Sequence, residues 1–193
     1  MCSVLGSQEG DVLKVGLLNG KMGSGTVTRR DRDILEMIVD LRDDPPAPLP
    51  VTLLVALPRP PTVRKVVECS VALGIKRLIF MQSSRVEKSY WQSPLLQEGN
   101  LSEHVYRGLE QARDTVMPEI RFGRRFKPFV EDELPALAAG TRCLVAHPDG
   151  AAGLRYAGQP LTIAIGPEGG FVSYEIDALS AAGFERVTLG PRI

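Results

Sequence analysis

The amino-acid sequence predicts an α/β fold in which an open sheet follows a small β unit. After residue 50, apolar strand-like runs alternate with segments of helical periodicity, the pattern of a mostly parallel sheet covered by helices. Residues 51–57 form a continuous apolar run, typical of a strand buried on both faces. Just before this run, residues 45–50 contain four prolines, which remove backbone donors and hold an extended path. The sequence therefore predicts two parts, residues 1–46 and 47–193.

Composition limits the function classes. The 193 residues suffice for one domain with a small appendage. Their 23 Lys and Arg balance 23 Asp and Glu, and this zero net charge excludes a protein that holds nucleic acid by bulk charge alone. No apolar run approaches the roughly 20 residues that span a bilayer, and the first residues lack the pattern of a secretion signal. We therefore expect no membrane partner.

The cysteines and histidines offer no disulfide or metal pattern. Cys2, Cys69 and Cys143 form no CxxC pair and are odd in number, which favours a reducing cytoplasm over a disulfide framework. His104 and His147 are far apart, and neither has a second ligand at metal spacing. The sequence therefore predicts a cytoplasmic protein without a metal site.

The first part reads as β structure. Residues 11–18 are a strand-like run, and Asn19-Gly20 is a pair that type I′ hairpins favour. A further strand is expected at residues 34–39. These strands are too few for a closed barrel, so we expect a small or partial β unit.

Helices of the second part are predicted from their boundary residues. One covers residues 62–73, with Thr62 as its cap and Gly74 as its stop. Another covers residues 102–116 and ends before Pro118.

A third helix is expected to begin at a Ser173 cap and to end at Gly183. Glu175 and Asp177 stand in its first turn, where the helix dipole favours acidic side chains. Besides the strand at 51–57, strands are predicted at residues 78–81, 143–146, 161–165 and 186–189.

The loop Ile165-Gly166-Pro167-Glu168-Gly169-Gly170-Phe171 is the most informative segment. It joins a predicted strand to a predicted helix, and open α/β sheets bind ligands at the carboxyl ends of their strands. Glycines let a ligand approach the backbone closely. A tight connection without any ligand is the equally weighted alternative. The glycines of residues 20–25 lie instead in a hairpin context and do not form a phosphate loop.

Four cations fall within residues 121–127, interleaved with Phe122 and Phe126. This pattern suits phosphate contacts and base stacking on RNA. It equally suits an edge strand with its charges facing solvent and its aromatic rings facing the core, and both readings can hold together. The cations are Arg121, Arg124, Arg125 and Lys127.

The loop at 165–171, followed after a helix by Leu189-Gly190-Pro191-Arg192-Ile193, resembles the paired signature of the bacterial 16S ribosomal RNA uracil-N3 methyltransferases. The resemblance extends to residues 10–16, 73–75 and 110–113. It implies a SPOUT-type, trefoil-knotted α/β methyltransferase domain behind a partial N-terminal PUA-like β-barrel. It also implies S-adenosylmethionine as cofactor and a homodimer that acts on the small ribosomal subunit.

The resemblance further implies where the cofactor lies. It would contact three loops through backbone groups, and apolar side chains would sandwich the adenine ring. The implied residues are His147 and Pro148; Gly166, Pro167, Glu168, Gly169 and Gly170; Leu189, Gly190, Pro191, Arg192 and Ile193; and the apolar walls Leu144, Ile165 and Leu189.

Methyl transfer to N3 of uracil needs that nitrogen deprotonated and aligned with the methyl group, so positioning and stabilisation of an anion are the expected contributions. Arg85 resembles a family arginine, and it would stabilise the uridine anion or grip a phosphate. Glu168 would act as the base or orient the loop. A solvated surface charge for Arg85 and a helix-capping role for Glu168 are the alternatives.

This chain departs from the family pattern at Gly6, Cys69 and Ala72, and it stops at Ile193 where relatives continue into a final helix. The resemblance therefore predicts a chain shortened at both ends, with a cut third loop, weak cofactor binding and little methyl transfer. The predicted function is S-adenosylmethionine-dependent methylation of N3 of a uridine in 16S ribosomal RNA. The alternatives are a non-catalytic RNA-binding or ribosome-assembly protein and, less supported, a nucleotide-binding α/β enzyme unrelated to RNA.

Overall fold

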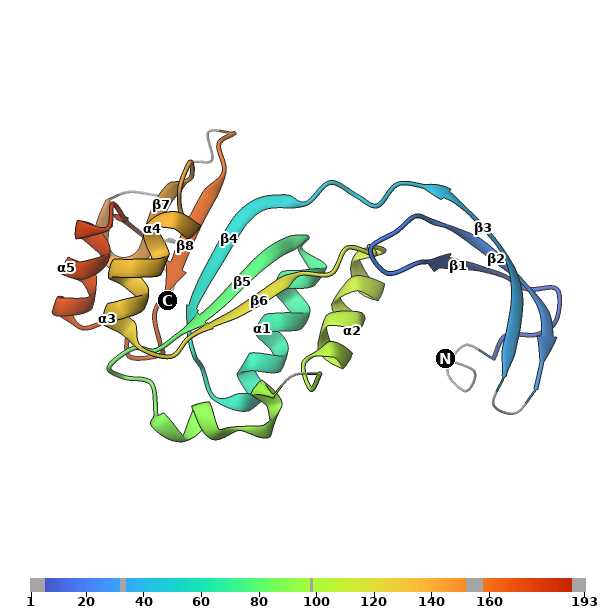
Figure 1. The fold of residues 1–193 in the computed structure, drawn as a ribbon, viewed down its shortest axis with the longest axis horizontal. Helices are drawn as coiled ribbons and strands as arrows, with labels where there is room; N and C mark the ends of the chain where they lie inside the picture. Colours follow the sequence, from blue (N-terminus) through green and yellow to red (C-terminus); the bar gives the residue numbers. More distant parts are fainter. Residues whose placement is uncertain (1–5, 32–33, 98, 152–157, 189–193) are drawn as a thin grey trace.

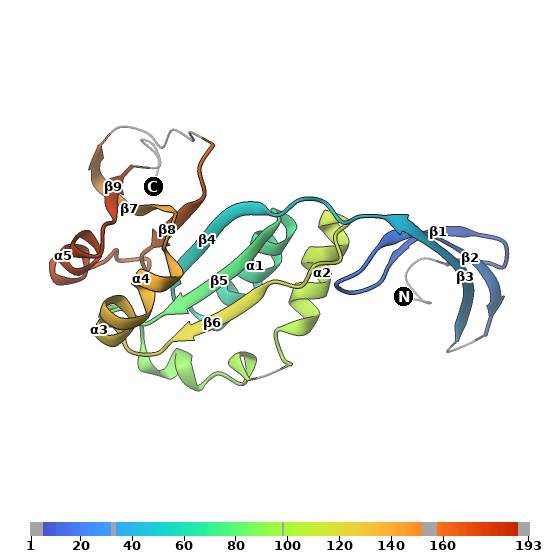
Figure 2. The ribbon, with the colours of Figure 1, turned by 45° about the horizontal axis from the view of Figure 1, so that its top comes forward.

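The computed structural model describes residues 6–31, 34–97, 99–151 and 158–188. It contains two sheets, an antiparallel one of three strands and a parallel one of six (Figures 1 and 2). The predicted α/β class with an open parallel sheet is therefore confirmed. The division at residue 46 stays a prediction, although the last strand of the small sheet ends at Asp43 and the first strand of the large one begins at Leu49.

The small sheet consists of β1 (Val12–Gly16), β2 (Met22–Arg30) and β3 (Leu35–Asp43), paired in that order. The turn between β1 and β2 holds Asn19 in the left-handed region at φ 58°, as the predicted Asn-Gly hairpin requires. Residues 34–39 are correctly predicted as strand, but the strand runs on to Asp43.

The hairpin turn docks onto the segment that leads into the large sheet. The backbone N–H of Asn19 donates to the carbonyl of Thr115 at 2.8 Å, and the Asn19 side-chain oxygen accepts from the N–H of Met117 at 2.9 Å. In return, the Thr115 hydroxyl donates to the carbonyl of Gly20 at 2.5 Å. Three hydrogen bonds therefore join the two sheets at one turn.

The large sheet has the order β6-β5-β4-β8-β7-β9, and every neighbouring pair is parallel. Leu54, Ile79 and Phe80 are fully buried at its centre, as expected for strands covered on both faces. In chain order the strands are β4 (Leu49–Ala56), β5 (Ile75–Met81), β6 (Glu119–Gly123), β7 (Arg142–Ala151), β8 (Leu161–Ile165) and β9 (Glu185–Val187).

Helices and short turns connect these strands. Helix α1 packs against α2 and β5 on one side of the β4–β6 half, while α3, α4 and α5 lie toward the other half (Figure 1). The helical elements are α1 (Pro60–Ala72), η1 (Lys88–Gln92), η2 (Pro94–Leu96), α2 (Ser102–Ala112), α3 (Phe126–Pro128), η3 (Phe129–Glu133), α4 (Leu134–Leu137) and α5 (Ser173–Ala181).

The strand order reverses between β4 and β8. The chain leaves β4 through α1 toward β5 on one side, and it leaves β8 through α5 toward β9 on the other. In open α/β sheets, a crevice for ligands forms at the carboxyl ends of two such strands. The loop at 166–172 follows β8 at this position.

Two predicted helix caps are wrong. Helix α1 begins at Pro60, whose fixed φ suits the first helical position, so Thr62 lies inside the first turn. Helix α5 is preceded by Val172, and Ser173 is its first residue. Gly74 and Gly183, at φ 82° and 89°, follow α1 and α5 as predicted.

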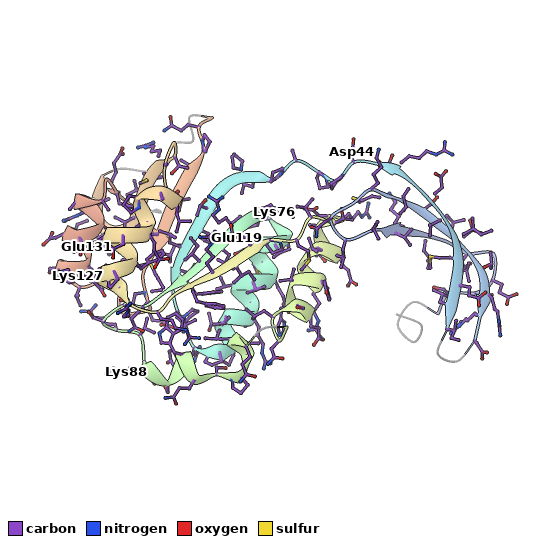
Figure 3. All side chains as sticks on the ribbon, viewed as in Figure 1. Asp44, Lys76, Lys88, Glu119, Lys127 and Glu131 are labelled. Carbon is purple, nitrogen blue, oxygen red and sulfur yellow. The ribbon has the colours of Figure 1, made fainter. Side chains whose placement is uncertain are left out.

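Two predicted boundaries also differ. The helix expected to reach residue 116 ends at Ala112, because Arg113 adopts a left-handed conformation at φ 51°. The side chain of buried Asp114 accepts a hydrogen bond from the N–H of Val116 at 2.9 Å and pairs with half-buried Lys76 at 2.5 Å, a residue labelled in Figure 3. The strand predicted at 143–146 extends to Ala151.

Candidate active site

The loop predicted to bind a ligand lies between β8 and α5, as its sequence indicated. The N–H of Gly170 donates to the carbonyl of Pro167 at 2.7 Å and closes a tight turn, with Gly170 at φ 73°. A Cβ atom at Gly166 would stand 3.1 Å from both the ring and the backbone nitrogen of Phe171. Glu168 and Gly169 are exposed at the tip of the turn. Glycine at 166 and 170 therefore permits this path, and the tip of the loop is open to a ligand.

Arg85 holds this loop from the end of β5. Its guanidinium donates to the carbonyl of Gly169 and, at 3.4 Å, to that of Gly170. The Arg85 side chain is also the nearest neighbour of a Cβ built at Gly169, at 3.0 Å. In this structure Arg85 therefore positions the loop.

A buried carboxylate also links residues 83–85 to the loop between β8 and α5. Glu175, only 1% exposed, accepts hydrogen bonds from the Ser83 hydroxyl at 3.0 Å and from the backbone N–H of Ser84 at 2.6 Å. It also accepts from the N–H of Val172 at 3.0 Å, which caps α5. Four hydrogen bonds therefore join residues 83–85 to residues 169–175, and the expected acidic first turn of α5 proves to be the anchor of the site.

Tyr90, in η1, is influenced by charged groups of several segments. Partial burial of its ring is the largest cause that raises the pKa of Tyr90 above its ordinary value, and the carboxylate of Glu87 adds to this through charge and a hydrogen bond. The charge of Glu168 raises the pKa further, while Arg59, just before α1, lowers it. The charges of Glu168 and Arg59 therefore act on the Tyr90 hydroxyl in opposite directions.

The other residues predicted to bind the cofactor do not all lie beside the loop. Ile165 is half-buried beside the loop, whereas Leu144 is fully buried in a small core with Leu161 and Val187. His147 and Pro148 lie within β7, where its pairing with β9 is irregular, and not in a turn that follows the strand. Leu189, Gly190, Pro191, Arg192 and Ile193 lie outside the described residues.

The cation cluster at 121–127 divides into two kinds of residue. Arg121 pairs with Glu119 at 2.5 Å, and Lys127 pairs with Glu131 at 3.8 Å, a pair visible in Figure 3. Arg121 lies on the edge strand β6, where Phe122 turns inward and stacks on Phe80, so the edge-strand reading is confirmed for residues 121–123. It is wrong for residues 124–127, because β6 ends at Gly123 and Phe126 begins α3. Arg124 and Arg125 form no ion pair with any described carboxylate, and Arg124 instead lies 5.2 Å above the Trp91 ring.

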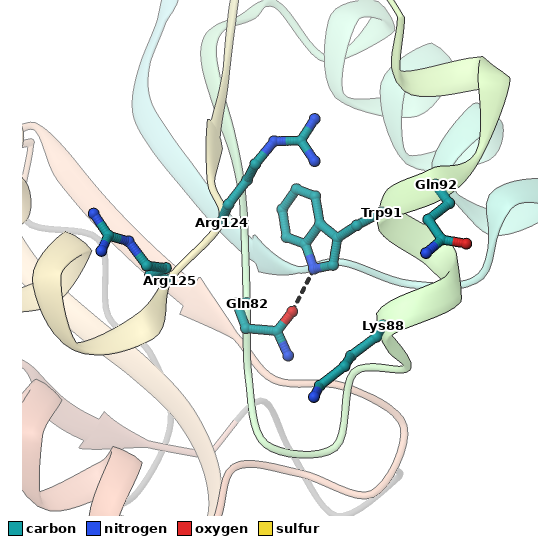
Figure 4. A pocket seen from close by; sticks show the side chains of 6 residues that line it. All are labelled: Gln82, Lys88, Trp91, Gln92, Arg124 and Arg125. Atoms are coloured by element: carbon teal, nitrogen blue, oxygen red, sulfur yellow. Dashed lines mark hydrogen bonds between the residues drawn. The ribbon is translucent and has the colours of Figure 1, made fainter.

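An open hollow of about 480 Å³ lies at the carboxyl ends of β5 and β6. Figure 4 shows Trp91 near its centre, with Arg124 on one side and Lys88 on another. The residues that line it are Gln82, Lys88, Trp91, Gln92, Arg124 and Arg125. Four of them were not predicted. The lone tryptophan in a polar loop was their only sequence signal, since the partners of Trp91 lie far from it in the chain.

Within the described ranges, no helix is long and apolar enough to cross a membrane. The same residues contain no group of three or more metal-ligating side chains.

Comparison with known proteins matches residues 45–193 to the RNA methyltransferase domain family. The chain is 30% identical to the ribosomal RNA small subunit methyltransferase E of Treponema pallidum, covering 98% of this chain and 73% of that protein. It is 29% identical to the Synechocystis protein of the same name, covering 76% of this chain and 48% of that one.

Solved structures share the fold. A ribosomal RNA small subunit methyltransferase E from Neisseria gonorrhoeae, bound to S-adenosyl methionine, superposes with a TM-score of 0.76 at 21% identity, covering 100% of this chain and 80% of that one. A putative methyltransferase from Legionella pneumophila, also in complex with this cofactor, gives 0.75 at 22% identity, again over 100% and 80% of the two chains.

Proposed function

This chain belongs to the RNA methyltransferase domain family, and we propose that it transfers a methyl group from S-adenosylmethionine to N3 of a uridine in 16S ribosomal RNA. The observation that carries the proposal is the anchored loop at 166–170, which opens at the reversal point of the sheet. Family membership favours a transferase over the non-catalytic RNA-binding alternative. It also favours RNA chemistry over an unrelated nucleotide-binding enzyme.

The residues present suit the cofactor. The loop tip at Glu168 and Gly169 is exposed, the absence of a side chain at Gly170 leaves open space beside the backbone, and half-buried Ile165 supplies an apolar side chain. When bound, S-adenosylmethionine supplies an electrophilic methyl group. Backbone groups of residues 166–170 would hold it, with Pro167 fixing the turn. The assigned roles of Leu144, His147, Pro148 and residues 189–193 remain proposals of the same kind.

Arg85 and Glu168 have distinct proposed tasks. Because the Arg85 guanidinium bonds the carbonyls of Gly169 and Gly170, it is best supported as the residue that holds the loop in register with the acceptor nucleotide. Glu168 is an exposed carboxylate at the loop tip. It is suited to accept the N3 proton of uracil, which makes that nitrogen nucleophilic, and then to release the proton to water.

The finer architecture follows from the resemblance and belongs to the proposal. We expect the second part of the chain to be a methyltransferase domain of the trefoil-knotted SPOUT type and the small sheet to belong to a PUA-like barrel that helps to bind RNA. We also expect a homodimer in the bacterial cytoplasm, where the small ribosomal subunit is assembled. Light scattering coupled to size-exclusion chromatography tests the dimer directly.

Cofactor binding can be tested with two matched glycine variants. Gly170 and Gly140 have φ values of 73° and 75°, and a Cβ atom meets nothing within 4 Å at either position. Gly170→Ala and Gly140→Ala therefore introduce similar backbone strain of about 1 kcal/mol, but only the first distorts the candidate loop. Titration calorimetry with S-adenosylhomocysteine should show weakened binding for Gly170→Ala alone. Equal affinities in both variants would remove the loop from the cofactor site.

The reaction itself is tested with small ribosomal subunits that lack the modification. Radiolabelled S-adenosylmethionine should label their RNA, and nuclease digestion with mass spectrometry should identify 3-methyluridine. Label on another atom would refute the N3 assignment. RNA binding without any label would favour the non-catalytic alternative.

A further inference from the structure

We propose that the hollow around Trp91 is a binding subsite for a nucleotide of single-stranded RNA that flanks the methyl-accepting uridine. The proposal rests on the proposed function and adds a substrate-binding site to it. In this subsite Lys88, Arg124 and Arg125 bind phosphate, and the Trp91 ring stacks on the base.

The charge of the hollow is available for a ligand. Its three cations form no ion pair with a described carboxylate, in contrast to the nearby Arg121 and Lys127. All three side chains are exposed, yet they come from two separate segments, η1 and the turn after β6. Three exposed positive charges around one hollow, on a chain of zero net charge, make a local site that attracts an anion.

The aromatic floor of the hollow is held rigidly. The indole N–H of Trp91 donates to the side-chain oxygen of Gln82, and the Trp91 ring packs edge-on against Phe122 at 6.3 Å between centroids. Arg124 lies above the ring at 5.2 Å. Aromatic rings and guanidinium planes are the surfaces on which proteins stack unpaired RNA bases. A fixed ring loses little entropy when a base binds, so this arrangement favours a nucleotide over an isolated phosphate.

The hollow is connected to the cofactor loop through one residue, Gln82. Its side-chain amide holds Trp91 on one side and donates to the carbonyls of Ser83 at 2.6 Å and Val86 at 3.3 Å on the other. Ser83 and Val86 bracket Arg85, which bonds the loop at Gly169. A nucleotide in the hollow therefore lies beside the candidate active site, as a neighbour of the target uridine would.

Trp91 is the single tryptophan of the chain, so its fluorescence reports on this hollow alone. We would titrate the full chain with a short oligouridylate RNA, following tryptophan fluorescence and, in parallel, the anisotropy of labelled RNA. Arg124→Ala/Arg125→Ala is the test variant, and Arg77→Ala/Arg107→Ala, which changes two exposed and ion-paired arginines elsewhere in the same domain, is a control that removes the same charge. Calorimetry with S-adenosylhomocysteine is run on each protein.

We expect RNA to quench Trp91, and we expect the test variant to bind RNA about tenfold more weakly with a salt slope reduced by about 1.4, since each phosphate contact on a single strand contributes roughly 0.7. The control should change affinity by less than about twofold, because its cations are already paired. Equal losses in the two variants, or RNA binding without quenching, would overturn the subsite. If S-adenosylhomocysteine binds while RNA leaves Trp91 unaffected, the subsite fails and the proposed function stands. If the cofactor fails to bind to the wild-type chain, the proposed function itself fails.

Discussion

The carboxylate of Glu175 accepts the backbone N–H of Ser84 at 2.6 Å, although 91 residues separate the two in the chain. Through this bond and the one from Ser83, the end of β5 is fixed to the start of α5. The candidate cofactor loop is thereby held at both ends, by β8 before it and by this buried anchor after it.

Glu175→Ala should therefore destabilise the protein by about 3 kcal/mol, because three donors lose a charged acceptor and two of them are at least partly buried. Urea unfolding followed by circular dichroism measures this. Asp177→Ala, which removes an exposed acid two residues later, should cost less than about 0.5 kcal/mol. Similar losses for the two variants would show that the anchor is not what stabilises this region.

Arg85→Ala should weaken S-adenosylhomocysteine binding about tenfold, which corresponds to about 1.4 kcal/mol for the lost hydrogen bonds to the loop. Arg85→Lys keeps one donor group, and its affinity for S-adenosylhomocysteine should lie between those of the wild type and Arg85→Ala. Arg107→Ala, on the exposed face of α2, serves as a charge-matched control and should bind normally. An unchanged affinity in Arg85→Ala would contradict the loop-holding role and favour direct stabilisation of the uridine anion by Arg85.

Tyr90 should ionise above its ordinary pKa. A raised pKa in the folded state means that any stability from this group is present below about pH 10 and is lost as the pH rises through the folded value. The pH titration of near-ultraviolet absorbance is measured for the wild type and for Tyr90→Phe, and the difference between the two curves gives the ionisation of Tyr90. In Glu87→Gln the pKa of Tyr90 should fall only partly, since burial is the larger cause, and a complete return to the ordinary value would show that Glu87 alone raises it.

The docking turn can be tested at Asn19. Asn19→Gly keeps the left-handed backbone but removes the acceptor for Met117, and it should cost about 0.5–1 kcal/mol and accelerate amide exchange at Met117. Asn19→Ala should cost about 1 kcal/mol more, because alanine is strained at positive φ. Equal stability of the two variants would show that the left-handed backbone is not retained in solution.

Local chemistry predicted the elements whose boundaries depend on neighbouring residues. The strand at 161–165 and the stops at Gly74 and Gly183 follow from apolar runs and from the need for positive φ. The expected end of α2 at residue 116 was wrong because Asp114 pairs with Lys76, 38 residues earlier. Such a long-range ion pair leaves no periodic signal.

The candidate site shows the same division. The loop at 166–170 was visible from its glycines, and the edge strand β6 was foreseen as one reading of residues 121–127. That Arg124 and Arg125 differ from Arg121 and Lys127 depends on carboxylates that only the folded chain brings near. Gln82 and Trp91 were missed because their roles arise from contact with each other.

The strand order also dictates when the site comes into existence during folding. Strands β4, β5 and β6 follow one another in the chain and are parallel neighbours in the sheet. Strand β8 instead pairs with β4 across more than 100 residues, and it lies between β4 and β7 although β7 comes earlier in the chain. Pairings that close long loops are slow, so β8, together with β7 and β9, which connect to the sheet through it, should join the β4–β6 half last. A chain emerging from the ribosome would then complete its hydrophobic β4–β6 half well before it acquires any affinity for a cofactor.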